Sequence, residues 1–166
     1  RKTWDSFSKA LLQQDEYRSR AGTLSTESQI NQFFHTLFER DASASELIYW
    51  STKINQGWLY TYEIPENLIK NASEKDTALK IQDYTTLDYK TVYAEKFTTA
   101  ITKTTSLILA YQPESVSPTW KAGKALQVGI DFIDEVTSTY QPDLDLALKE
   151  LLDPGSANSY NFTLNK

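Results

Sequence analysis

Five carboxylates near the end of the chain have the residue types and spacing that acid–base chemistry requires. Asp131, Asp134 and Glu135 occur together in one predicted helix, and Asp143 and Asp145 follow it. Pairs of Asp and Glu hydrolyse glycosidic bonds, one as an acid and the other as a base or nucleophile. However, one member of such a pair needs a raised pKa, and nothing in the local sequence predicts one. We therefore interpret these residues as solvated helix faces or caps.

Other catalytic and metal-binding motifs are missing from the sequence. The only histidine, His35, lies between aromatic residues of a predicted helix, and no serine-nucleophile motif accompanies it. Cysteine is absent, which excludes disulfides and thiolate chemistry, and the five glycines are isolated, so no phosphate loop is formed. Carboxylate oxygens could bind Ca²⁺, but the EF-hand spacing is not present. The sequence predicts a protein that is not an enzyme and has no cofactor or metal site.

A strip of aromatic residues is a stronger candidate for ligand binding. Trp58, Tyr60 and Tyr62 alternate with other residues, which would place all three on one side of an extended segment. Glu63 and Asn67 follow with side chains that form hydrogen bonds. Aromatic faces beside such groups suit the apolar faces and hydroxyls of sugars. The sequence thus indicates a sugar site here, with burial of the rings in the core as the alternative.

Composition limits the classes of partner. The chain has 166 residues, a net charge of −5 and 40% hydrophobic residues. It lacks the basic clusters that neutralise phosphates, and no apolar run is long enough to span a bilayer, so we expect neither nucleic-acid binding nor membrane insertion. The length suits one domain with a substantial core. We predict a single helical domain over 1–153, followed by a polar tail or linker over 154–166.

Hydrophobic periodicity predicts a helix hairpin in the first half of the chain. The strongest apolar stripe covers 30–38, after an N-cap at Ser25 or Thr26. The sequence Ser-Ala-Ser-Glu at 43–46 matches a capping box, and the helix that it starts reaches Gly57, which can adopt the left-handed conformation after a helix. Two helices joined by so short a loop are expected to be antiparallel.

Further helices are predicted along the rest of the chain. A weaker capping box at 73–76 and a less periodic stretch through Asp83 separate two of them. The fold class is therefore all-α, a compact bundle of six or seven helices. Besides the hairpin, the predicted helices are about 3–18, 65–72, 87–101 with a continuation through Leu109, 117–139 starting at Ser117-Pro118, and 143–152.

Residues 30–57 also carry a family resemblance. The run from Ile30 through Asp41 to Trp50 resembles a pattern found in helical domains of bacterial S-layer proteins and type-I-secreted adhesins. In that pattern an apolar helix is followed by Gly-Arg-Asp-Ala-Asp, then by Gly-Leu-x-Tyr-Trp, and then by a closing Gly. Glu39, Ser43 and Glu46 depart from it. The likeness covers roughly 4–101, including Asn71-Ala-Ser and Ala94-Glu-Lys-Phe-Thr, with extra C-terminal helices at 117–152. The matching residues are Arg40, Asp41, Ala42, Leu47, Tyr49, Trp50 and Gly57.

The resemblance implies a scaffold more directly than a ligand. The family is distantly similar to phycobilisome linker domains, and no enzymatic activity attaches to it as a whole. Asp41 would brace the interhelical loop, Arg40 would bind its carbonyls, and Tyr49 and Trp50 would pack beneath it. In some S-layer proteins a helical domain of this kind fastens the protein to surface polysaccharide or lipopolysaccharide.

Together these observations predict an extracellular attachment domain at the bacterial cell surface. The expected partner is a surface glycan, bound through the aromatic strip and its polar neighbours. A protein-interaction or structural spacer module, binding other domains of the same protein or a second copy, is the alternative. A carbohydrate-active enzyme using the acidic clusters is a third and weaker reading.

Overall fold

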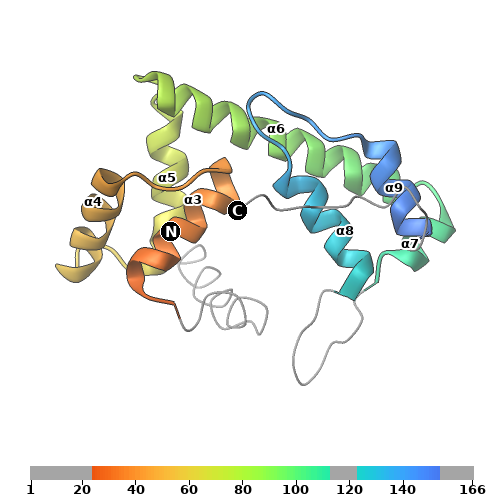
Figure 1. Cartoon of the computed structure of the whole chain (residues 1–166), viewed down its shortest axis with the longest axis horizontal. Coiled ribbons are helices and arrows are strands. Elements are labelled where there is room, and N and C mark those ends of the chain that lie inside the picture. The colour runs from red at the N-terminus through yellow and green to blue at the C-terminus, as the bar shows by residue number, and fades with distance from the viewer. Residues whose placement is uncertain (1–23, 113–122, 154–166) are drawn as a thin grey trace. The chain divides into compact units, whose positions relative to one another are not determined.

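The computed structural model describes residues 24–112 and 123–153, and within these ranges the chain is all-helical. The predicted all-α class is confirmed. The predicted helix at 3–18, the helix start at Ser117-Pro118 and the tail 154–166 lie outside the described residues. The helices are α3 (Thr26–Phe38), α4 (Ala44–Asn55), the 3-10 helix η1 (Thr61–Glu63), α5 (Ile64–Ser73), α6 (Ala78–Ile101), α7 (Thr105–Ala110), α8 (Gly123–Asp134) and α9 (Leu144–Leu152) (Figure 1).

The contacts divide the chain into two compact units, which meet in sequence at Leu87 and Asp88. The first unit contains α3, α4, η1, α5 and the start of α6, and the second contains the rest of α6 with α7, α8 and α9. The predicted limits of a single domain at 1–153, and of its family-like part, stay predictions. Each unit has its own apolar core.

The core of the first unit is built on α3, against which α4 and α5 both pack (Figure 1). Ile30, Phe34 and Phe38 recur at helical spacing and are all buried, as the apolar stripe predicts. Trp50 from α4 joins this cluster. From α5 the cluster receives Ile64, Leu68 and Ala72.

The loop between α3 and α4 makes the predicted helix hairpin. The Ser25 hydroxyl caps α3, and at Ser43 both halves of the capping box form, since Glu46 Oε2 accepts the Ser43 amide at 2.8 Å. Gly57 has φ +72, the left-handed conformation predicted after α4. Glu39 also has a positive φ, +53, at the end of α3, where the resembling family has glycine. The hairpin therefore forms with a residue that is strained at this position.

Ser43→Ala should lower the free energy of unfolding by about 1 kcal/mol, because it removes the side-chain acceptor for the Glu46 amide and a partner of the Glu46 carboxylate. Chemical denaturation followed by circular dichroism measures the change. Ser45→Ala is the matched control: Ser45 is exposed in the first turn of α4 and caps no backbone amide, so its substitution should be close to neutral. Equal effects of the two substitutions would contradict the capping interpretation.

Several predicted helix boundaries are wrong, two of them because another residue caps the helix. Ser73 lies inside α5 and bonds the Lys70 carbonyl, whereas the Thr77 hydroxyl accepts the Lys80 amide and starts α6 at Ala78. The stretch through Asp83 is thus helical. The predicted continuation of α6 is a separate helix, because Thr104 caps α7. Helix α8 ends at Asp134 rather than 139, and Thr137 forms a turn with Tyr140.

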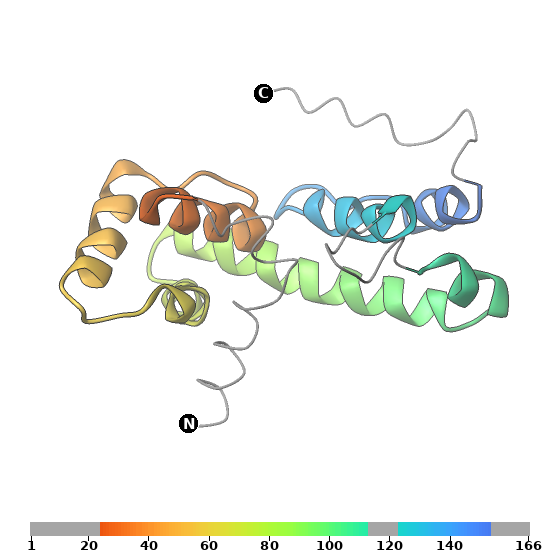
Figure 2. The same ribbon diagram turned by 90° about the horizontal axis from the view of Figure 1, so that it is seen from below.

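The second unit has an aromatic core. Phe97 of α6 stacks on Phe132 of α8 with ring centroids 5.3 Å apart, and Tyr111 packs edge-on against Phe97. Helix α9 packs against both α7 and α8 (Figure 2), and it begins as predicted at Asp143, whose side chain caps it. None of the helices in the described ranges combines the length and apolar character that crossing a membrane requires.

Candidate functional site

The predicted aromatic strip is not extended. Glu63 Oε2 accepts the Tyr60 amide at 2.8 Å and the Glu63 amide bonds the Tyr60 carbonyl, so the chain turns into η1. Tyr60 and Tyr62 consequently stack on each other, with centroids 5.3 Å apart and planes 7° apart. The alternation predicted one common face, but a 3-10 turn places side chains differently from a strand. Trp58 therefore separates from the two tyrosines.

Trp58 and Asn67 do come together, in an open pocket of about 260 Å³ that we call the Trp58 pocket. Tyr60, Tyr62 and Glu63 are not among its lining residues. Trp58 is 67% exposed, an unusual degree for a tryptophan, so its ring is available to a ligand rather than part of the core. The pocket is lined by Tyr49, Trp50, Lys53, Trp58, Leu59, Asn67, Lys70, Asn71 and Glu74.

Cationic and amide groups surround the rings of the Trp58 pocket. Lys53 Nζ lies 4.8 Å from the centre of the Tyr49 ring and 5.4 Å from that of Trp58, which orients the two rings around one ammonium group. Lys70 forms no ion pair with any described residue, while Glu74 is paired with Lys80 at 2.6 Å outside the pocket. The Asn67 amide donates to the Glu63 carbonyl, which fixes the side chain at the pocket wall. Aromatic faces and polar donors are thus both available here.

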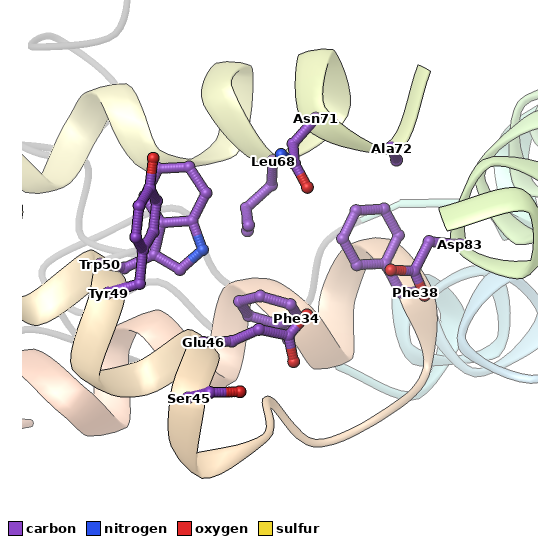
Figure 3. Close-up of a pocket in the computed structure, with 10 residues that line it drawn as sticks. All are labelled: Phe34, Phe38, Ser45, Glu46, Tyr49, Trp50, Leu68, Asn71, Ala72 and Asp83. Atoms are coloured by element: carbon purple, nitrogen blue, oxygen red, sulfur yellow. The ribbon is translucent and has the colours of Figure 1, made fainter. Parts of the chain in front are cut away.

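A second pocket, of about 340 Å³, lies between α4 and α5, and we call it the Trp50 pocket. Figure 3 shows Tyr49 and Trp50 at the left of the pocket and Leu68, Asn71 and Ala72 of α5 along its top, with Glu46 below and Asp83 at the right. Phe34 and Phe38 supply its apolar surface. The two pockets share Tyr49, Trp50 and Asn71, so they adjoin along one groove.

The carboxylates of the Trp50 pocket are held by Arg40. Arg40 donates from Nε and Nη2 to the two oxygens of Asp83, both at 2.7 Å, and from Nη1 and Nη2 to Glu46 at 3.0 and 2.8 Å. Its guanidinium lies 4.9 Å from the centre of the Phe34 ring. Burial alone would lower the pKa of Arg40, but the bonds to Asp83 and Glu46 outweigh this and raise it. Arg40 therefore stays protonated and remains paired with Glu46 and Asp83.

Two of the other residues that carry the resemblance, Arg40 and Asp41, form hydrogen bonds in the loop between α3 and α4. Asp41 Oδ1 accepts the Asn31 amide at 2.8 Å and lies 2.7 Å from His35 Nε2, and these contacts lower the pKa of Asp41. Arg40 also donates to the Asp41 carbonyl. Trp50 is buried, whereas Tyr49 is 52% exposed and does not pack beneath the loop. Tyr49 stands at the junction of the two pockets instead.

The acidic residues of the second unit serve different local purposes. Asp143 caps α9 and Asp131 accepts a bond from Gln127. Glu135 is half-buried and its pKa is raised by burial, with a smaller effect from Asp131. Asp134 lies 3.9 Å from Lys90. In the described ranges, no three or more His, Cys, Asp or Glu side chains are grouped as a metal ion would need.

Sequence reasoning missed Lys53, Lys70 and Asp83 as pocket residues. Lys53 and Lys70 lie on α4 and α5, and only the packing of both helices on α3 brings them to one pocket. Asp83 fell in a stretch predicted to be irregular. Comparison of the chain with protein-family models, curated proteins and solved structures found no match.

Proposed function

We propose that this protein is a non-catalytic attachment domain that binds a bacterial surface polysaccharide or lipopolysaccharide through the Trp58 pocket. The observation that carries the proposal is the exposed Trp58 ring, set beside Tyr49 and surrounded by the polar groups of Lys53, Asn67 and Lys70. Sugars present apolar faces of C–H groups that stack on such rings, and their hydroxyls bond the surrounding amides and ammonium groups.

The cell-surface setting is part of the same proposal. The resemblance of residues 30–57 to domains of S-layer proteins and secreted adhesins supports it, as does the lack of cysteine. The exposed ammonium group of Lys70 favours a glycan that carries anionic groups, since acidic or phosphorylated sugars would bond with it. An extracellular anchor that holds a larger protein to such a glycan needs binding and no turnover.

Trp58→Ala should weaken binding to smooth envelope polysaccharide by about tenfold or more, because it removes the stacking surface of the pocket. Immobilised extracts from a smooth strain and from an O-antigen-deficient strain give the comparison, with binding of the purified domain measured by biolayer interferometry. Wild type should bind the smooth extract and bind the deficient extract poorly.

Tyr60→Ala provides a matched control for that measurement. Tyr60 is 64% exposed, close to the 67% of Trp58, but it stacks on Tyr62 and does not line the pocket. It should leave binding within about twofold of wild type, since it lies outside the contact surface. Equal losses from both substitutions, or absence of wild-type binding to every extract, would contradict the proposal.

A protein-interaction module is the second candidate, and the outer face of α4 supports it. Ile48 is 66% exposed beside the 52% exposed Tyr49, which is a surface of the kind that interfaces cover. This reading predicts a mass that rises with concentration and falls back in Ile48→Ser. A strictly monomeric domain that binds smooth polysaccharide would favour the attachment function over it.

A further inference from the structure

The Trp50 pocket contains features that the stacking of sugars in the Trp58 pocket does not use. It combines an apolar surface, formed by Phe34, Phe38 and Leu68, with a carboxylate end formed by Glu46 and Asp83. Its volume of about 340 Å³ suits a ligand of the size of a monosaccharide. The chemistry of its polar groups indicates which ligand.

The first polar feature is an excess of negative charge. Arg40 is one cation and Glu46 and Asp83 are two anions, so the trio carries one net negative charge. Arg40 is not among the residues that line the pocket, whereas both acids are. Glu46 Oε1 and both oxygens of Asp83 each accept one bond from Arg40 and can accept another, whereas Glu46 Oε2 already accepts three. A cationic group would complete their charge balance and receive charge-assisted hydrogen bonds.

The second feature is an unused donor in the wall. Only 6% of Trp50 is exposed, and its indole N–H has no hydrogen-bond partner among the described residues. Figure 3 shows the indole nitrogen on the edge of the ring that faces the pocket interior. The Asn71 amide lines the same pocket and likewise forms no side-chain hydrogen bond within the described part of the chain. Asn71 is an exposed residue, so its amide and the Trp50 N–H are both available to donate to a ligand, which favours a polar ligand over an apolar one.

We infer that the Trp50 pocket binds a sugar residue that carries a free amino group. The protonated amine lies against Glu46 and Asp83, a ring or hydroxyl oxygen accepts the Trp50 N–H, and the apolar face of the ring lies on Phe34 and Leu68. This inference rests on the proposed function and deepens it. The adjoining Trp58 pocket holds the neighbouring sugar of the same glycan, because Tyr49 and Asn71 line both pockets.

The Trp50 indole N–H is the natural probe for this inference. The domain, labelled with ¹⁵N, is titrated with glucosamine, with N-acetylglucosamine and with glucuronic acid, which are cationic, neutral and anionic at pH 6.5. Trp50→Phe assigns the Trp50 signal among the four tryptophans of the chain. Glucosamine should shift this signal saturably with a dissociation constant on the order of a few mM, as befits so small a ligand.

Substitution of one acid tests the source of the selectivity. Glu46→Gln keeps the shape of the side chain but makes the trio neutral, and it should weaken glucosamine binding by about tenfold, since one charge-assisted bond is lost. Circular dichroism checks that the variant stays folded. Equal shifts with N-acetylglucosamine, no saturable shift with glucosamine, or unchanged affinity in the folded Glu46→Gln variant would each overturn the inference. If one of these results is found while Trp58→Ala still loses binding to smooth polysaccharide, this inference fails but the proposed function is retained.

Discussion

Phe34→Ala is expected to lower the free energy of unfolding by about 4 kcal/mol. The ring is 1% exposed at the centre of the first core cluster. It packs edge-on against Phe38 at 5.8 Å, and the Arg40 guanidinium lies over its face. Truncation therefore removes buried apolar surface, leaves a cavity and removes the cation–π contact of the Arg40 guanidinium with the ring. Urea denaturation followed by Trp fluorescence would measure the loss.

Phe33→Ala is the matched control, one position away on the same helix. Phe33 is only partly buried and packs at the margin of the cluster. Its removal should cost about half as much, because surrounding water can fill part of the space and less apolar area is lost. A Phe34→Ala variant as stable as Phe33→Ala would contradict the central place of Phe34 in the core of the first unit.

The helices and their caps could largely be predicted from the sequence, because both depend on residues close together in the chain. The stripe Ile30, Phe34, Phe38 predicts the buried face of α3, and Ser43 with Glu46 predicts the start of α4. Prediction failed at the start of α6. The sequence predicts a capping box at 73–76, but Ser73 lies inside α5 and the Thr77 hydroxyl accepts the Lys80 amide instead, because α5 continues to Ser73.

The candidate site could be predicted only in part, since it depends on which helices pack together. Trp58 and Asn67 were predicted together and do line one pocket. Tyr60 was predicted to join them, but the bond from its amide to Glu63 turns the chain away. Asp83 was missed because its partner Arg40 lies 43 positions earlier in the chain, and no local pattern reports an ion pair at that separation. The Trp50 pocket is consequently a feature of the fold alone.

Arg40→Ala is expected to lower the free energy of unfolding by about 3 kcal/mol, because it removes the common partner of two carboxylates in the fold. Asp83 is 4% exposed and would remain as a buried charge with no cation beside it. Arg40→Lys retains the positive charge but not the planar fork that bonds both acids, so its loss should be intermediate. Thermal and urea denaturation at pH 7 would order the three proteins. An Arg40→Ala variant as stable as Arg40→Lys would contradict this argument, because it would mean that the positive charge retained by Lys does not stabilise the fold.

The same substitution should change how stability depends on pH. Burial opposes ionisation of Glu46, but hydrogen bonds from Arg40 and Ser43 outweigh it and lower the folded-state pKa of Glu46 below its ordinary 4.5. The folded protein thus binds this proton less readily than the unfolded chain does. The resulting stabilisation is fully present above pH 4.5 and is lost as the pH falls through the folded-state pKa. In Arg40→Ala burial acts with less opposition, so the pKa of Glu46 rises and the acid-induced loss of stability between pH 6 and pH 3 becomes smaller. Urea midpoints measured across that range for wild type and Arg40→Ala test this. If the midpoints of the two proteins fall equally steeply as the pH is lowered, Arg40 does not set the ionisation of Glu46.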